Sequence, residues 1–519
     1  MSCLVSFCLS LWLAASPVRT SAPDEDISVL ALLPRNNSYI FSISRVSPAI
    51  EYARRRLESP GLRFSVDYAD SNCHNDALFA LVDRAMGGRT PDLLLGPVCE
   101  YAASQVVRLA SHWNIPVVSA GALASGFSLM RSEYTHLTRV APTYLKMGET
   151  FYAMFEYFGW KKALLVFDDD KEERNCFFTI EGVHNVLIEQ HHIEHLSINS
   201  KEFKVDLDEI MKFVQDSEVI IMCAGADIVR EIMLAAHRRK LTNGRYIFFN
   251  IELFNSSLYG DGSWYRGDKY DSDAKHAYAS LNTMTLLRSV KPEFENFTME
   301  LRKSNKKTGL HNGNFENVNM FMEGFHDALV LYTIALEEAR KSGYTKKDGD
   351  QITQRMWNRS FEGIAGQVNI DVNGERYGDF SVMAMTDYDA GTYETVINYF
   401  GINESLQLLP GFNSDRFSLH GRVRTPEPLP DDPCNSHLTL TVPPGTINSN
   451  SANHCGLGVS AVTGIIVGAL LGTALLMAFY FFRKNYRITI ERRTQREECN
   501  MGKHRQLRED SIRSNFSAA

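Results

Sequence analysis

The sequence lacks the short motifs that identify several large classes of enzyme. It has no HExxH helix of zinc proteases, no GxxxxGK[ST] loop for nucleotide phosphates and no GxSxG turn of serine hydrolases. His191, His192 and His195 lie close together, but we interpret the polar stretch around them as a solvated loop rather than a metal site. We therefore expect a protein that is not an enzyme, has no metal or organic cofactor and has no nucleic-acid partner.

Charge is missing from residues 459–482, a run of 24 residues. At about 1.5 Å per residue, a helix of this length reaches roughly 36 Å, enough to cross a hydrocarbon core of about 30 Å. Arg483, Lys484 and Arg487 follow the run, and basic flanks stay on the cytoplasmic side. We expect one transmembrane helix, with residues 483–519 inside the cell and the large N-terminal part outside.

The tail of 37 residues is shorter than a folded domain, which needs about 50. We therefore expect it to act inside the cell by contact rather than by catalysis.

The N-terminus agrees with this orientation. An apolar run from Leu4 to Ala15 precedes small residues at Thr20, Ser21 and Ala22, which predicts a cleaved signal peptide at residues 1–22. A retained anchor is the alternative. The exported part then consists of an ectodomain at residues 23–424, long enough for two or three cores, and a polar juxtamembrane linker at residues 425–458.

Charge differs between the two sides of the expected membrane helix. The tail carries a net charge of +5 and the rest of the chain −13. An acidic ectodomain suits a basic ligand, although ordinary solubility would give the same acidity. The exported part has five glycosylation sequons, at Asn36, Asn255, Asn296, Asn358 and Asn403.

The cysteines are sorted by compartment. Cys3 and Cys8 lie in the signal peptide and Cys499 in the reducing cytosol, which leaves six in an oxidising environment. Six cysteines allow fifteen pairings. Separations of 26 and 47 residues favour the pairs Cys73 with Cys99 and Cys176 with Cys223. The linker holds Cys434 and Cys455, of which we expect at least one to bridge two chains; a local loop between them is the alternative.

The ectodomain alternates between short apolar runs and amphipathic helical segments. The strand-like runs are residues 27–33, 64–68, 92–96, 115–119, 163–167, 219–223 and 246–250, and the helical segments are 48–57, 76–86, 100–112, one after 145, 178–190 and 227–240. This order predicts an α/β fold with two doubly wound parallel sheets and a cleft at the carboxyl ends of their strands. We expect one lobe at residues 23–145 with part of 246–360, and the other at 146–245 with part of 361–424.

Five segments, residues 96–101, 111–122, 248–257, 356–366 and 463–491, resemble the natriuretic peptide receptors, and the clearance type in particular. The resemblance covers nearly the whole chain after the signal peptide. It implies a bilobed ectodomain of the type I periplasmic-binding-protein kind that dimerises and holds one natriuretic peptide (atrial, B-type or C-type) between two protomers. It also implies removal of the peptide by internalisation, without a guanylate cyclase domain.

The resemblance also assigns site residues. Ser71, with the backbone N–H groups of Val98 and Cys99, matches a chloride site; a plain serine turn before a disulfide is the alternative. The residues that match hormone contacts are Tyr101, Arg108, Glu133, Tyr134, Phe177 and Glu181. Aromatic rings and carboxylates suit a flexible peptide that carries arginines.

The membrane segment and the tail suggest further contacts. Gly464, Gly468 and Gly472 recur at four-residue spacing, which predicts a dimer face in the membrane helix. Basic clusters at residues 492–496 and 503–508 suit an anionic leaflet, while the family resemblance implies coupling to Gi. With two linker cysteines, a disulfide-linked tetramer is a further hypothesis. The alternative functions are a receptor that acts mainly through G proteins, or a bilobed sensor that binds an amino acid inside each cleft.

Overall fold

The computed structural model describes residues 25–171, 173–202, 204–253, 262–287, 291–307 and 318–417. Among these residues, no helix is both long and apolar enough to span a bilayer. The expected signal peptide, juxtamembrane linker, transmembrane helix and tail lie outside the described residues, as does Asn255. The same is true of Cys434, Cys455 and the membrane glycines.

The structure has two lobes, each built on one eight-stranded sheet with its covering helices. The sheet of lobe 1 comes mainly from the N-terminal part of the chain. Its strand order is β11-β12-β13-β5-β4-β3-β1-β2, and the strands from β2 to β13 run parallel. The bounds are β1 (Glu25–Leu33), β2 (Leu62–Asp70), β3 (Leu93–Leu95), β4 (Val117–Ser119), β5 (Leu137–Pro142), β11 (Arg359–Glu362), β12 (Gln367–Ile370) and β13 (Glu375–Arg376).

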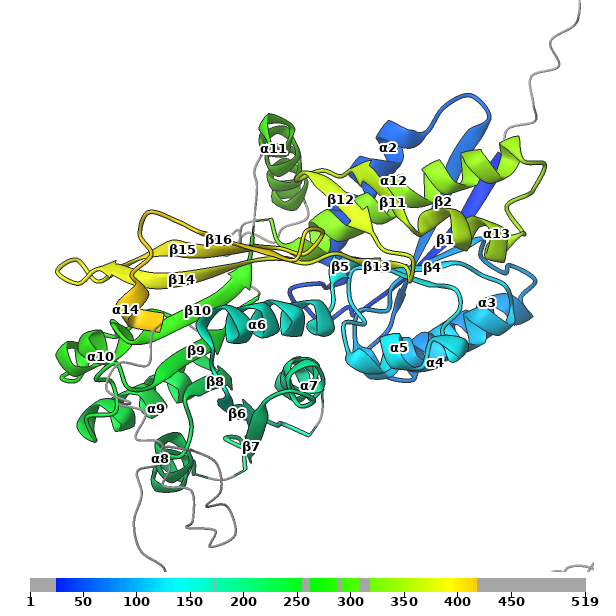
Figure 1. Cartoon of the computed structure of the whole chain (residues 1–519). Helices are drawn as coiled ribbons and strands as arrows, with labels where there is room; N and C mark the ends of the chain where they lie inside the picture. Colours follow the sequence, from blue (N-terminus) through cyan, green and yellow to red (C-terminus); the bar gives the residue numbers. More distant parts are fainter. Residues whose placement is uncertain are drawn as a thin grey trace, which may run out of the picture. The chain divides into compact units, whose positions relative to one another are not determined.

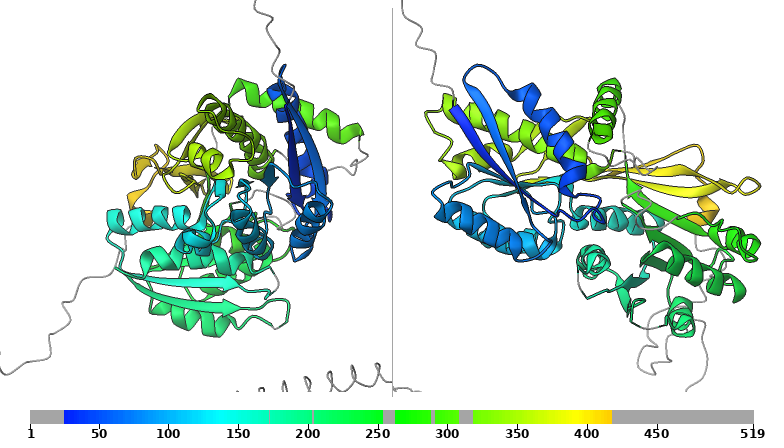
Figure 2. Two further views of the ribbon diagram at one scale, coloured as in Figure 1. Left: turned by 90° about the vertical axis from the view of Figure 1, so that its right-hand side faces the viewer. Right: turned by 180° about the vertical axis from the view of Figure 1, so that it is seen from behind.

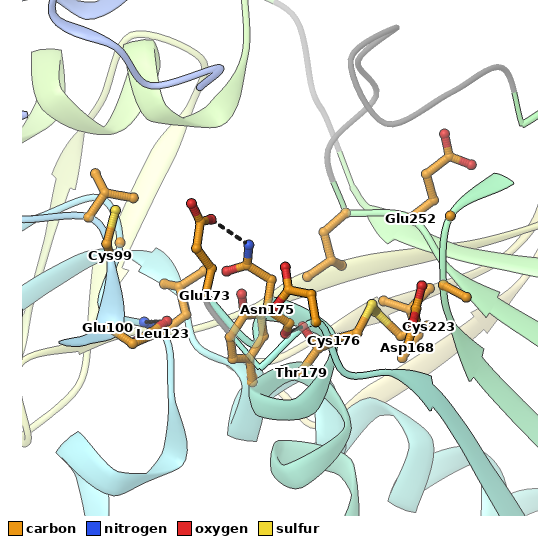
Figure 3. Close-up of a pocket in the computed structure, with 18 of the residues that line it drawn as sticks. Cys99, Glu100, Leu123, Asp168, Glu173, Asn175, Cys176, Thr179, Cys223 and Glu252 are labelled. Atoms are coloured by element: carbon orange, nitrogen blue, oxygen red, sulfur yellow. Dashed lines mark hydrogen bonds between the residues drawn. A yellow bond between two sulfur atoms is a disulfide. The ribbon is translucent and has the colours of Figure 1, made fainter. Parts of the chain in front are cut away.

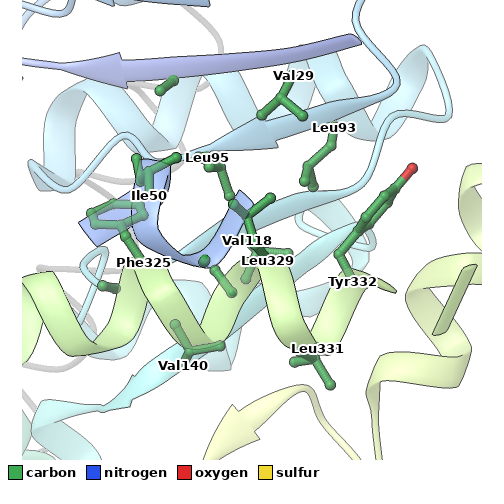
Figure 4. Close-up of a cluster of buried hydrophobic side chains, with 14 of the residues drawn as sticks. Val29, Ile50, Leu93, Leu95, Val118, Val140, Phe325, Leu329, Leu331 and Tyr332 are labelled. Atoms are coloured by element: carbon green, nitrogen blue, oxygen red, sulfur yellow. The ribbon is translucent and has the colours of Figure 1, made fainter. Parts of the chain in front are cut away.

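Helices cover both faces of this sheet (Figures 1 and 2). One face carries α2 (Ile43–Leu57), α12 (Met320–Lys341) and α13 (Gly349–Met356), and the other carries α3 (Asp76–Met86), α4 (Glu100–His112) and α5 (Ser125–Leu129). Strand β1 shows why its sequence is continuously apolar: Val29 packs toward α12, as Figure 4 shows, whereas Leu30 packs toward α3 and α4. Outside this layer, α11 (Pro292–Lys307) packs on α2 through Phe297 and Tyr52.

The second sheet, lobe 2, repeats the arrangement with the order β16-β15-β14-β10-β9-β8-β6-β7. Its strands are β6 (Lys162–Asp168), β7 (His192–Ile198), β8 (Val219–Cys223), β9 (Ile247–Ile251), β10 (Leu281–Leu286), β14 (Asp379–Asp387), β15 (Thr392–Phe400) and β16 (Ser405–Leu408). Helices α6 (Tyr144–Phe158) and α7 (Asn175–Leu187) cover one face, and α8 (Leu207–Gln215), α9 (Ala226–Arg238) and α10 (Asp271–Tyr278) the other. The short α14 (Ser414–Phe417) ends the described chain.

Within the described elements the chain passes between the lobes three times. It leaves lobe 1 from β5 into α6, returns from β10 into α11, and leaves again from β13 into β14. Each lobe is therefore completed by segments that lie far from its first strands in sequence.

The central strands and helices confirm the two α/β lobes, with three corrections. The sheets are mixed rather than parallel throughout, because β11 and β12 in lobe 1 and β14 to β16 in lobe 2 are antiparallel. Helix α2 begins at Ile43 rather than near Pro48, since a proline close to a helix start removes only one hydrogen bond.

The third correction concerns the histidine-rich stretch, where the expectation of a loop was wrong. Residues from His192 form the edge strand β7, and the His191 side chain is buried against the ring of Phe155, with ring centroids 5.0 Å apart. A partly exposed edge strand has no continuous apolar run, so its sequence looks like a loop. Among the described residues, no group of three His, Cys, Asp or Glu side chains is placed to hold a metal.

Candidate functional site

The candidate anion site lies where β2 ends and α4 begins. Ser71 is fully buried, and its hydroxyl accepts a hydrogen bond from the Cys73 N–H at 3.4 Å. A disulfide between Cys73 and Cys99 holds this turn at the residue before α4. In the described structure the N–H groups of Val98 and Cys99 donate to no acceptor, and α4 has no side-chain cap. A buried hydroxyl beside two such amides fits an anion such as chloride.

Four of the six residues matched to hormone contacts gather in lobe 1. Arg108 donates from Nε to Glu133 Oε2 at 2.5 Å, and its guanidinium lies 4.9 Å from the centre of the Tyr134 ring. Burial raises the pKa of the Tyr134 hydroxyl, against the opposing effect of Arg108. Tyr101, on the first turn of α4, is 40% exposed. Arg108 is therefore held by its neighbours, while the Tyr101 ring is available to a ligand.

The other two matched residues lie on α7 in lobe 2. The Arg174 guanidinium lies 3.8 Å from the centre of the Phe177 ring. Glu181 Oε2 accepts a hydrogen bond from Ser125 Oγ, on α5 of lobe 1, at 2.7 Å. The two groups are joined by Phe178, whose ring centre is 5.6 Å from that of Tyr101 and 5.3 Å from that of Phe177. The structure thus brings the matched residues into one region that spans both lobes.

Glu100 is a buried carboxyl that the sequence did not single out. Its two oxygens accept hydrogen bonds from the N–H groups of Leu123 and Ala124, at 3.0 and 3.3 Å. Burial raises the pKa of this carboxyl to about 7, although the two N–H donors and the charge of Arg139 act in the opposite direction. A glutamate in the first turn of a helix is ordinarily exposed and interacts with the helix dipole, so the sequence alone does not indicate that Glu100 is buried.

A buried ion pair fixes the same loop from the other side. Arg139 Nη2 lies 2.6 Å from Glu375 Oε1, and both side chains are almost fully buried. The Arg139 guanidinium also donates to the carbonyls of Ala122 and Ala124, at 2.9 and 3.2 Å. The loop between β4 and α5 is therefore held at its N–H groups by Glu100 and at its carbonyls by Arg139.

A cavity of about 370 Å³ lies between the lobes, at the carboxyl ends of the parallel strands where the sequence predicted a cleft. Figure 3 shows Cys99, Glu100 and Leu123 from lobe 1 on one side, and Asp168, Cys223 and Glu252 from lobe 2 on the other. Both disulfides favoured by the cysteine spacing, Cys73–Cys99 and Cys176–Cys223, are formed and line this cavity.

The described sequons are accessible. Four asparagines are exposed, which is compatible with glycans on the surface; they are Asn36, Asn296, Asn358 and Asn403.

Comparison with known proteins identifies the class. The model of the receptor family ligand binding region matches residues 45–387. Atrial natriuretic peptide receptor 3 from Mus musculus is 57% identical, over 96% of this chain and 93% of that protein, and the Homo sapiens protein of the same name is 57% identical, over 96% and 92%. Human atrial natriuretic peptide receptor 2 is 30% identical, over 73% of this chain and 38% of that protein.

The fold and the matching region define a receptor with a two-lobed ligand-binding region. Within that class, the chain belongs to the natriuretic peptide receptor family and to its type 3, or clearance, members. The family resemblance found in the sequence is confirmed.

Proposed function

We propose that this chain is a cell-surface receptor that binds natriuretic peptides and lowers their extracellular level by internalisation. The observation that carries the proposal is the 56–57% identity to type 3 receptors over 96% of the chain. The region of Tyr101, Glu133 and Glu181 supports it, because an exposed ring and two carboxylates suit a basic peptide with apolar side chains.

Saturation binding of labelled C-type natriuretic peptide to cells that express the full chain, followed by acid-resistant uptake, tests the proposal. We expect binding followed by uptake. Binding without uptake would favour the alternative of a receptor that acts mainly through G proteins. No binding of atrial, B-type or C-type peptide would contradict the proposal.

Chloride supports peptide binding in this proposal, through Ser71 and the amides of Val98 and Cys99. The buried hydroxyl, and two N–H groups that have no acceptor among the described residues, are the features that favour an anion there. Replacement of chloride by gluconate should weaken peptide binding by the wild type, while Ser71→Ala should bind weakly in both salts. Equal chloride dependence of both proteins would argue against this site.

A homodimer is the assembly that we propose for the ectodomain. Helix α3 exposes two large apolar side chains one heptad apart, Phe79 at 55% and Met86 at 82%, which supports a contact on this face. The test uses a protein that already carries Cys434→Ser and Cys455→Ser. In that background, the change of Phe79 and Met86 to Glu should yield monomers, as measured by light scattering. The control is Met299→Glu, an exposed apolar residue on α11 that should leave the dimer intact. Dimers in both variants would exclude α3 as the interface.

Residues 459–482 supply the single membrane crossing in this proposal, with the N-terminus outside. A tag after residue 519 should be detected only after permeabilisation, and a tag after residue 22 without it.

Coupling to Gi is proposed for the basic segments of the tail, and removal of residues 492–508 should abolish any pertussis-toxin-sensitive fall in cyclic AMP. Peptide uptake in that truncated receptor then shows whether clearance depends on the same segment.

A further inference from the structure

Arg174, the residue directly before α7, is held in a fixed geometry. Its Nε and Nη2 atoms donate to the two carboxylate oxygens of Asp169, at 3.0 and 2.8 Å. Its backbone N–H donates to Asp170 Oδ1 at 2.9 Å, and its backbone is left-handed, with φ 56° and ψ 33°. Residues other than glycine rarely adopt this conformation, which persists where surrounding contacts enforce it and recurs at functional sites.

The carboxylate that holds Arg174 is itself fixed to the sheet of lobe 2. Asp169 directly follows β6 and is 6% exposed, and its N–H donates to the carbonyl of Ile198, at the end of β7, at 2.8 Å. Its Oδ1 also accepts from the Lys171 N–H at 3.1 Å. The hydrogen bond from Arg174 lowers the pKa of the Asp169 carboxyl, so the pair stays charged near neutral pH.

The same guanidinium contacts the proposed peptide region. It lies 3.8 Å from the centre of the Phe177 ring, and Phe178 links that ring to Tyr101 of lobe 1, with ring centres 5.3 and 5.6 Å apart. Hydrogen bonding to Asp169 above all, and also to Tyr101, raises the pKa of the Arg174 guanidinium above its ordinary value, against the effect of its partial burial. Arg174 therefore connects two of the residues matched to hormone contacts, one from each lobe.

These contacts require an arginine. A planar guanidinium can donate two parallel hydrogen bonds to one carboxylate and also stack on an aromatic ring, whereas a lysine ammonium group has the charge without the planar fork. Because the carboxylate of Asp169 balances this charge, the guanidinium can lie in the region without repelling a basic peptide.

We propose that Arg174 is a positioning residue for peptide recognition. Tied to lobe 2 by Asp169, it fixes the ring of Phe177 and, through Phe178, the placement of that ring against Tyr101 before the peptide binds. Such preorganisation raises the affinity, because less conformational entropy is lost when the peptide binds. This inference rests on the proposed function of peptide binding.

Arg174→Lys and Asp169→Asn, each in the full chain, test the proposal. Both remove the two parallel hydrogen bonds, and we expect each to bind labelled C-type natriuretic peptide about 3- to 30-fold more weakly than the wild type. The control is Arg230→Lys, which breaks a fork of the same kind in the same lobe, where two N–O distances to Asp268 are 2.9 Å. It should lower the midpoint of thermal unfolding in detergent micelles and change the peptide affinity by less than about twofold.

A double-mutant comparison separates positioning of the Phe177 ring from a general effect on the fold. In a Phe177→Leu receptor, which keeps an apolar side chain, the further change Arg174→Lys should weaken binding by less than about twofold, because the ring that Arg174 positions is absent. Competition with unlabelled peptide measures these affinities. A loss of the same size with and without the Phe177 ring would overturn the proposal.

Two further results would also overturn it, whatever the Phe177→Leu receptor binds. One is wild-type affinity in both Arg174→Lys and Asp169→Asn, and the other is an equal loss of affinity in Arg174→Lys and Arg230→Lys. If the wild type binds none of the three natriuretic peptides, the proposed function fails. If the wild type binds and Arg174→Lys binds equally well, only the inference about Arg174 fails.

Discussion

At the scale of single residues, the carboxyl of Glu100 makes the stability of the fold depend on pH. Its folded pKa of about 7 lies above the ordinary value of 4.5, so the folded state holds a proton that the unfolded state releases. The resulting stability is fully present below about pH 4.5 and is lost as the pH rises through about 7. We expect the unfolding free energy of the wild type to fall relative to Glu100→Gln between pH 5 and 8, by about 1.4 kcal/mol per unit of pKa shift.

Thermal unfolding at pH 5, 6, 7 and 8 measures this difference. Parallel curves for the wild type and Glu100→Gln would show that another group governs the pH dependence.

The pair of Arg139 and Glu375 allows a matched comparison of buried and exposed charges. Glu375→Gln should cost about 3–5 kcal/mol of unfolding free energy, because it leaves the Arg139 guanidinium buried without its carboxylate. The control is Glu338→Gln, which breaks the more exposed pair with Arg359 and should cost less than about 1 kcal/mol. Denaturant unfolding measures both values, and equal losses would contradict the account.

At the scale of elements, the residue before the edge strand β7, His191, has a buried imidazole, with Nε2 3.6 Å from the Glu156 carboxylate. Both ring nitrogens of His191 are buried without a hydrogen-bond partner in the described structure, and burial lowers the pKa of the imidazole. Its neutral form stabilises the fold above about pH 6.5, and this contribution is lost as the pH falls through the lowered folded pKa. We expect His191→Phe, which keeps the ring beside Phe155, to be less sensitive to acid than the wild type.

Unfolding midpoints at pH 7 and pH 5 test this expectation, with exposed His192→Phe as the control. A larger loss in His191→Phe than in the wild type at pH 5 would refute it.

The elements also show how much of the fold can be predicted from the sequence. The bounds of α3, α4 and β8 match the predicted segments, because continuous apolar runs and regular helical spacing are local signals. Strands β11 to β16 were not predicted, since they join the two sheets through the pairs of β13 with β5 and of β14 with β10, whose partners lie far apart in the sequence. At the site, Tyr101 and Glu181 came from the family resemblance, whereas the buried state of Glu100 depends on packing that no local pattern reveals.

At the scale of the whole molecule, Glu181 has two roles that can be separated. It carries a charge in the proposed peptide region and accepts the Ser125 hydrogen bond that joins the lobes. Ser125→Ala removes this bond, together with the one that Asn185 Nδ2 donates to Ser125 Oγ at 3.1 Å, and keeps the charge of Glu181. Glu181→Gln removes the charge. If the peptide meets the carboxylate, Glu181→Gln should weaken peptide binding by about 1.5–3 kcal/mol, and Ser125→Ala by less.

Competition binding with labelled peptide on membranes measures both affinities. An equal loss in the two variants would mean that Glu181 acts by positioning the lobes, with no direct contribution to recognition.

The three passages between the lobes determine when the chain can fold as it is made. The first five strands of lobe 1 are complete by Pro142, but β13, which pairs with β5, ends at Arg376. At about 5–20 residues per second, the ribosome needs on the order of 10–50 s to supply it. Lobe 2 likewise waits for β14 to β16. Both sheets therefore spend this interval with an open edge, whose unpaired N–H and C=O groups are open to pairing with other chains until the last strands are made.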